Sequence, residues 1–224
     1  MSSPTVDIIV PFYNRADLLT LCLKAMQRAV GAEVGAVIVV DDASAPEERA
    51  KLEALAGTVK VPLKIEAHVE NQGFVKAIRT GMQRVRAPYV ILLNSDTIPT
   101  PGFARDLVEV LARRTEFKAA APISNATSDL FQWRPTAEVT PGPVVEMMKR
   151  IAEICGAARR EFANKLTEPP FLTGMCLALP TQTFWDMGLL SEEYEHGYFE
   201  DLDLCCRLRE AGHKLAIRED CFVY

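Results

Sequence analysis

Short apolar runs rich in β-branched residues alternate with stretches of helical period along the first half of the chain. Such runs are typical of buried strands, and the stretches between them are typical of amphipathic helices. We predict strands at 6–10, 37–40, 63–68, 89–93 and 118–121, and helices at about 15–29, 46–56, 74–85 and 102–113. Because strands that alternate with helices form βαβ units, we expect an α/β fold with a mostly parallel sheet flanked by helices.

The pattern changes after residue 122. A polar, proline-containing stretch at 124–143 predicts a long loop, and the next stretch, 144–166, is helical with a break near Gly156. Further on we predict a strand at 171–179, a helix at 200–211 and a strand that begins at 215–217. The chain has no internal repeat and no clear linker. We therefore expect a single domain over 1–224, with one half at 1–122 and a smaller lobe at 123–224.

Polar side chains follow three of the predicted strands directly: Asn14 with Arg15, Asp41 with Asp42, and 94–96. Ligands of open α/β sheets bind at the carboxyl ends of the strands, so we expect these clusters to converge on one binding site. Each cluster also has a local explanation. Asn, Ser and Asp commonly form turns at strand ends, and the Ser44 hydroxyl is placed to cap the helix that begins at Pro46.

A second acidic pair, Glu200 with Asp201, opens a predicted helix. A carboxylate there is stabilised by the helix dipole, which makes capping one interpretation. General-base catalysis is the other, because a carboxylate can take the proton of an attacking hydroxyl. Gly174 interrupts a strand-like run, and a glycine there indicates either a bulge, the close approach of a ligand, or simple packing.

Charge and cysteine usage narrow the class of protein. The net charge is -5, and no basic stripe is present, so nucleic acid is not an expected partner. The six cysteines form no C-x-x-C pair, which favours buried reduced thiols. The sequence has neither a secretory leader nor an apolar stretch of transmembrane length. We expect a cytoplasmic protein with no transmembrane segment.

Taken in order, six motifs resemble the family-2 glycosyltransferases of the GT-A fold, especially the rhamnosyltransferase-like branch. The resemblance runs from Asp7 almost to the last residue. Its motifs are IVPFYNR at 9–15, VVDDAS at 39–44, ENQGF at 70–74, LLNSDT at 92–97, TG at 173–174 and FEDLDLCCR at 199–207. The order and spacing of the six make the match specific, although each motif alone is weak.

The resemblance implies a role for each motif. Residues of the first half would hold the nucleotide: Pro11, Tyr13, Asn14, Asp41, Asp42, Asn71, Gly73, Asn94 and Ser95. Asp96 would ligate Mg²⁺ or Mn²⁺ on the diphosphate, in keeping with the preference of these ions for oxygen. Asp201 would be the general base, and Glu200 would touch the acceptor or the sugar. Residues 1–122 would be the nucleotide-binding half and 123–224 the acceptor and catalytic half.

Two features depart from the family pattern. Asn94 replaces the aspartate that usually begins the family's D-x-D motif, which lowers the negative charge of the metal site. Family members also carry a histidine just after the strand that follows the Glu-Asp helix, whereas this sequence ends at Tyr224. We therefore expect a catalytic domain truncated at its C-terminus.

The resemblance implies an inverting glycosyltransferase that uses a UDP- or dTDP-sugar. The acceptor would be a glycan or a lipid-linked sugar in bacterial polysaccharide or glycoconjugate synthesis, and missing regions would provide any peripheral membrane association. Two other classes stay open. One is a degenerate domain that binds nucleotide or glycan within a larger polymerase. The other is a sugar-phosphate nucleotidyltransferase, which would need a glycine-rich basic loop where this chain has 11–14.

Overall fold

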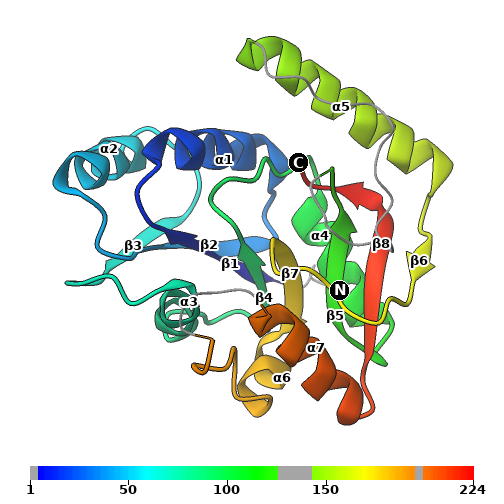
Figure 1. Ribbon diagram of the computed structural model, residues 1–224. Helices are drawn as coiled ribbons and strands as arrows, with labels where there is room; N and C mark the ends of the chain where they lie inside the picture. The colour runs from blue at the N-terminus through cyan, green and yellow to red at the C-terminus, as the bar shows by residue number, and fades with distance from the viewer. Residues whose placement is uncertain (1–4, 126–142, 195–198) are drawn as a thin grey trace.

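A computed structural model describes residues 5–125, 143–194 and 199–224. The fold is one eight-stranded sheet with helices on both faces (Figure 1). The strands are β1 (Val6–Phe12), β2 (Val34–Asp41), β3 (Leu63–Ala67), β4 (Tyr89–Leu93), β5 (Phe117–Ile123), β6 (Leu166–Thr167), β7 (Cys176–Pro180) and β8 (Lys214–Phe222). The helices are α1 (Ala16–Ala29), α2 (Pro46–Ala56), α3 (Phe74–Met82), α4 (Phe103–Arg113), α5 (Val144–Glu161), α6 (Thr181–Asp186) and α7 (Glu200–Glu210).

The strand order is β3-β2-β1-β4-β7-β5-β8-β6. The first four strands of this order pair in parallel, as the βαβ pattern predicts. β7 then runs antiparallel to both of its neighbours, and β6 runs antiparallel to β8. The predicted α/β fold is confirmed, and the antiparallel strands make its second half a mixed sheet.

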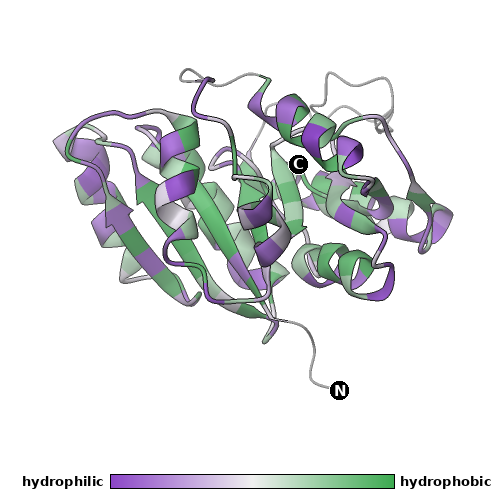
Figure 2. Cartoon of the chain, turned by 90° about the horizontal axis from the view of Figure 1, so that it is seen from below, coloured by the Kyte–Doolittle hydropathy of each residue, from purple (hydrophilic) through white to green (hydrophobic). Residues whose placement is uncertain are grey.

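Two apolar cores lie on opposite faces of the sheet. One contains buried residues of α1, α2 and α4, and the other contains buried residues of α3, α5, α6 and α7. Figure 2 shows the apolar strands between the helices, whose polar residues face outward. Within the described residues, no helix is both long enough and apolar enough to cross a bilayer.

The second half differs from the predicted elements in several places. α5 continues through Gly156, because buried Ile154, Cys155 and Ala158 around it pack the helix against the body, which outweighs the low helix propensity of one glycine. α5 nevertheless ends at Glu161, and β6 follows at Leu166. The strand predicted at 171–179 begins only at position 176, whereas β8 begins at Lys214, one residue before the predicted start. α6 was not predicted, and residues 126–142 of the predicted loop lie outside the described residues.

The contact between α3 and β1 is close enough to require a glycine. A Cβ atom on Gly81 would lie 2.6 Å from Cγ2 of the fully buried Ile9. We expect Gly81→Ala to lower the free energy of unfolding by about 1–3 kcal/mol, the usual cost of an overpacked core. Chemical denaturation measures this change.

Gly57→Ala is the matched control. Its Cβ would meet only the Ala54 carbonyl oxygen, at an ordinary 3.7 Å, and its φ of -74° suits any residue. This control should leave stability unchanged or raise it slightly. Equal stability of the two variants would contradict the tight packing of α3 on β1.

Candidate functional site

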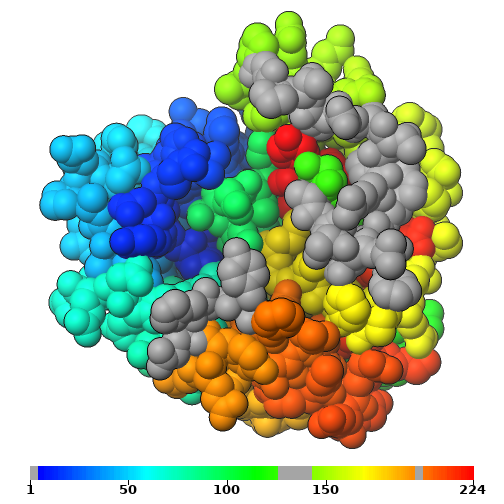
Figure 3. Space-filling model, in the orientation of Figure 1, coloured from blue at the N-terminus to red at the C-terminus, as the bar shows by residue number. Residues whose placement is uncertain are grey.

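A cavity of about 840 Å³ opens at the carboxyl ends of β1, β2 and β4. The segments that line it are coloured blue, teal and green in Figure 3 and meet on one face of the molecule. Eight of the residues predicted for the site line this cavity: Pro11, Tyr13, Asp42, Asn71, Gly73, Asn94, Ser95 and Asp96. The predicted convergence of the strand-end clusters is therefore confirmed for these residues.

Asn14 and Asp41 are not among the lining residues, and their side chains hold the backbone instead. The Asn14 side-chain oxygen accepts from the backbone N–H of Ala45 at 2.9 Å. The backbone N–H of Asn14 donates to the Ser44 hydroxyl at 2.8 Å. Asp41 is fully buried and accepts from the Ser44 N–H at 2.9 Å and from Arg49 Nε at 2.8 Å. These bonds tie the end of β1 to the end of β2. The expected cap by Ser44 is wrong, because Ala45 is the N-cap of α2 and has no side-chain cap bond.

Asp42 lines the cavity, and its hydrogen bonds hold the loop before α3. Its carboxylate accepts from the backbone N–H groups of Gln72 at 2.8 Å and Gly73 at 2.7 Å. The Asn71 amide donates to the Asp42 carbonyl oxygen at 3.3 Å. Gly73 adopts a φ of 88°, a conformation that side-chain-bearing residues rarely accept. The sequence motif at 70–74 therefore encodes a loop shaped around this carboxylate.

The segment 94–96 forms a turn without using its own side chains. The Thr97 hydroxyl donates to the Asn94 carbonyl oxygen at 2.7 Å and closes the turn. Within the described part of the chain, no hydrogen bond involves the side chains of Asn94, Ser95 or Asp96. Asp96 is exposed at the cavity. The turn interpretation therefore does not account for these side chains, which are available to a ligand.

The donor atoms at this edge fit a hard cation that binds together with phosphate. Among the described residues, no group of three His, Cys, Asp or Glu side chains could form a complete protein cage for a metal. Magnesium characteristically uses one or two carboxylates and completes its octahedron with phosphate and water oxygens. The Asp96 carboxylate, beside the oxygens of Asn94 and Ser95, matches that mode of binding.

Asp201 is held beside the end of β4 through two residues that precede β7. Its Oδ2 accepts from the Gly174 N–H at 2.8 Å, and the adjacent Met175 carbonyl accepts from the Asn94 N–H at 2.9 Å. A Cβ on Gly174 would lie 3.3 Å from the Asp201 Cβ, so this glycine permits the close approach. Asp201 Oδ1 accepts from the Leu202 N–H at 2.8 Å within the first turn of α7, but the N-cap of this helix is Phe199 and has no side-chain cap bond.

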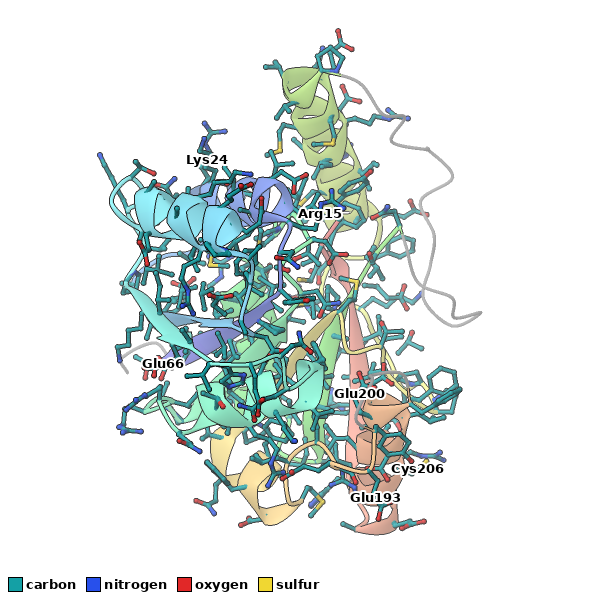
Figure 4. All side chains as sticks on the ribbon, turned by 60° about the vertical axis from the view of Figure 1, so that its left-hand side comes forward. Arg15, Lys24, Glu66, Glu193, Glu200 and Cys206 are labelled. Atoms are coloured by element: carbon teal, nitrogen blue, oxygen red, sulfur yellow. The ribbon has the colours of Figure 1, made fainter. Side chains whose placement is uncertain are left out.

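Glu200 points to the inner side of α7, whereas Cys206 lies on the outer side (Figure 4). Only 8% of Glu200 is exposed, and its Oε2 has no hydrogen-bond partner among the described residues. Burial raises the pKa of the Glu200 carboxyl, and the charge of neighbouring Asp201 raises it further. Glu200 is therefore the weaker candidate for a carboxylate that must be ionised to accept a proton.

Two arginines hold the segment between α6 and α7. Arg79 of α3 donates to the carbonyl oxygens of Gly188 at 3.0 Å and Leu190 at 3.1 Å. Arg207 of α7 donates to the Leu189 carbonyl oxygen at 2.9 Å. α7, which carries Asp201, is thus fixed relative to α3, which lines the cavity.

The sequence analysis missed one cavity-lining cation, Lys76. It is exposed on the first turn of α3 and has no ion pair with any described residue, whereas the other lining cation, Arg15, pairs with Asp17 at 2.9 Å. The only signal in the sequence was a lysine three residues after Gly73, which is unremarkable for a helix surface. In a cavity that also carries Asp96, Lys76 is placed to meet an anionic ligand.

Comparison with known proteins gives one family match. The model of "Glycosyl transferase family 2" matches residues 7–178. Among curated proteins, polypeptide N-acetylgalactosaminyltransferase 18 of Mus musculus is 26% identical over 220 residues, which are 95% of this chain and 35% of that protein. The chain thus spans about a third of the length of this relative.

Solved structures share the fold at low sequence identity. GalNAc-T7 with UDP, GalNAc and Mn²⁺ has a TM-score of 0.76 and 14% identity, over 99% of this chain and 44% of that one. The mannosyltransferase PcManGT of Pyrobaculum calidifontis, with GDP-Man and Mn²⁺, has a TM-score of 0.68 and 18% identity, over 98% and 58%. TarS of S. aureus has a TM-score of 0.67 and 14% identity, over 98% and 59%.

Lys76 provides a test of anion binding in the cavity. Lys76→Met keeps the aliphatic stem and removes the charge, so we expect UDP to bind about tenfold more weakly, the scale of one charged hydrogen bond. Uridine, which has no phosphate, should bind equally to both forms. Lys24→Met, on the exposed side of α1, is the matched control. Calorimetric titration measures both ligands, and an equal loss for UDP and uridine would contradict a phosphate contact.

Proposed function

Because the chain belongs to glycosyl transferase family 2, we propose that it transfers a sugar from a nucleotide diphosphate sugar to an acceptor hydroxyl, with inversion at the anomeric carbon. One observation carries the proposal. A single cavity combines Asp42 and Asp96 at the ends of β2 and β4, and Asp201 is tied to the same end of β4 through Gly174 and Met175.

In this proposal the donor nucleotide occupies the cavity between β1 and α3. Pro11 and Tyr13 contact the base, with Asp42 as the hydrogen-bond acceptor for the base or the ribose. Asn71 and Gly73 line the opposite wall. Tyr13 is half exposed and provides a ring for stacking. We propose a UDP- or dTDP-sugar, which agrees with the UDP bound by one structure of the same fold, although another binds GDP-Man.

Asp96 would hold Mg²⁺ or Mn²⁺ together with the diphosphate, assisted by Asn94 and Ser95. When bound, the ion supplies positive charge to the leaving diphosphate. The structures of GalNAc-T7 and PcManGT named above, each solved with a nucleotide, also contain Mn²⁺. Lys76 adds a positive charge to the cavity lining that would attract the diphosphate, although it does not replace the carboxylate that Asn94 lacks.

Asp201 acts as the general base in this proposal. It accepts the proton of the acceptor hydroxyl while that oxygen attacks the anomeric carbon from the side opposite the diphosphate. The Gly174 N–H holds the carboxylate in place and leaves it lone pairs for the proton. Phe199, which is 65% exposed, lies directly before Glu200 and offers an apolar surface for a sugar ring.

We propose that the acceptor is a glycan or a lipid-linked sugar in bacterial polysaccharide or glycoconjugate synthesis. We also propose that the protein is cytoplasmic. The rhamnosyltransferase-like branch and peripheral membrane association stay predictions. A non-catalytic nucleotide- or glycan-binding domain is the second candidate, and Asn94 favours it, because one carboxylate fewer weakens a metal site. The availability of Asp96 and Asp201 favours the enzyme.

The metal assignment predicts a conditional loss of affinity. Asp96→Ala should lower the affinity for UDP at least about tenfold, or about 1.4 kcal/mol, when Mn²⁺ is present. Without metal, the variant and the unaltered protein should bind UDP alike. Glu53→Ala, on the exposed face of α2, controls for surface charge. Calorimetry with and without Mn²⁺ measures the effect, and metal-independent binding by the unaltered protein would overturn the assignment.

The general-base assignment predicts a loss of turnover without a loss of binding. Asp201→Asn keeps the shape of the side chain and an oxygen for the Gly174 N–H, but the amide cannot take up the proton. We expect turnover, followed as UDP released from a UDP-sugar, to fall by roughly two to four orders of magnitude. UDP affinity should barely change, and the unfolding midpoint should fall only by the small amount expected for losing the Leu202 N–H bond to Oδ1.

Glu210→Gln, exposed at the last turn of α7, is the control for removing a carboxylate from this helix. A less stable Asp201→Asn variant whose folded fraction turns over normally would make Asp201 a helix cap rather than a base.

A further inference from the structure

We propose that His68 is a positioning residue for nucleobase recognition. With Thr80 behind it, His68 fixes the Asp42 carboxylate so that its remaining acceptor position selects a base that presents a ring N–H. Such bases are uracil, thymine and guanine, whereas cytosine and adenine present a ring acceptor instead. The inference rests on the proposed function, because it takes the cavity to be a nucleotide site.

The three side chains form a line of contacts from the end of β2 past the end of β3 to α3, and two of them are buried. His68 Nδ1 lies 2.7 Å from Asp42 Oδ1, and His68 Nε2 lies 2.8 Å from the Thr80 hydroxyl. The side chains of His68 and Asp42 are only 8% and 5% exposed. His68 directly follows β3, where its N–H donates to the Asp41 carbonyl oxygen at 2.9 Å, and Thr80 lies on α3. The imidazole is thus fixed at its backbone and at both ring nitrogens.

The chemistry of the pair sets the direction of the hydrogen bond. An ionised carboxylate has no proton to donate, so Nδ1 of His68 must donate to Asp42. The neutral ring then accepts at Nε2 from the Thr80 hydroxyl, and a charged ring donates there instead. In either state His68 directs an N–H at Oδ1 and restrains rotation of the carboxylate.

Counting hydrogen bonds shows what is left for a ligand. A carboxylate has about four acceptor positions. Oδ1 of Asp42 accepts from His68 and from the Gln72 N–H, and Oδ2 accepts from the Gly73 N–H. One position on Oδ2 remains, and Asp42 lines the cavity. A ligand atom that fills it must be a donor, and an opposing ring acceptor would leave both groups unsatisfied, which is costly in a buried site.

A purely structural role for His68 makes a different prediction. If His68 only packs α3 against β2 and β3, its removal should lower stability and weaken the binding of all nucleotides equally. If it positions Asp42, its removal should weaken the binding of only those nucleotides whose base donates to the carboxylate. The ratio of affinities for UDP and CDP separates the two roles, because these ligands share the ribose and the diphosphate.

The experiment titrates the full chain with UDP, CDP, dTDP and GDP at fixed Mn²⁺ and salt concentrations. We expect the unaltered protein to bind UDP at least roughly tenfold more tightly than CDP, the scale of one hydrogen bond to a charged group. His68→Phe should remove most of this preference by weakening UDP and leaving CDP within about twofold. The dTDP and GDP arms identify which of the bases with a ring N–H the cavity accommodates.

Three further variants make the result decisive. In His68→Asn the amide nitrogen lies near the position of Nδ1, so much of the preference for UDP should return. Thr80→Val removes the hydroxyl that contacts His68 Nε2 and should lower the preference for UDP over CDP by an intermediate amount. His213→Phe, at the turn after Gly212, is the matched histidine control. If His68→Phe fails to fold, His68→Asn and Thr80→Val still test the proposal.

An unchanged UDP-to-CDP ratio in the folded His68→Phe and Thr80→Val variants would overturn the positioning role, as would an equal loss for every nucleotide. Tighter binding of CDP by the unaltered protein would overturn the count of acceptor positions. Absence of binding for all four nucleotides would instead overturn the proposed function, so the two failures are distinguishable.

Discussion

The pairing of β7 with β4 is the contact on which the arrangement of the site depends. β7 enters the sheet antiparallel to β4, so the residues that precede β7 lie beside the residues that follow β4. This places Met175 against Asn94 and Gly174 against Asp201. A parallel strand in the same position would have brought its carboxyl end to this edge instead. The candidate base Asp201 and the candidate metal ligand Asp96 come from segments about a hundred residues apart. The antiparallel direction of β7 brings these two segments to the same edge of the sheet.

Buried carboxylates at the ends of strands serve mainly to hold loops. Asp41 accepts from the Ser44 N–H, Asp42 from the N–H groups at 72 and 73, and Asp7 from the N–H groups of Arg86 and Ala87. Removing a carboxylate from water is costly unless its oxygens are hydrogen-bonded, and turns leave backbone N–H groups without partners. The carboxylate oxygens and the backbone N–H groups therefore satisfy each other's hydrogen bonds. The binding role that we propose for Asp42 is added to this structural role and does not replace it.

The sequence predicted the first half of the fold well, because its strands and helices have the periodicity of their final structure. The bounds of α2 and β4 agree with the prediction, and the other elements differ by a few residues at their ends. The pattern could not predict the direction of β7, since a five-residue apolar strand reads the same either way. Nor could it separate Asp41 from Asp42, because neighbouring residues of a strand end face opposite sides. The pattern also does not indicate the contact of His68 with Asp42, because it joins residues 26 positions apart.

Hydrogen bonds to Asp42, which come from the chain itself, set the shape of the loop over 70–73. Its conformational entropy is therefore lost when the chain folds rather than when a ligand arrives. A mobile loop of the same composition would lose that entropy on each binding event, and the affinity would fall accordingly. In the proposed site, a nucleotide would therefore meet a wall whose shape the chain itself maintains.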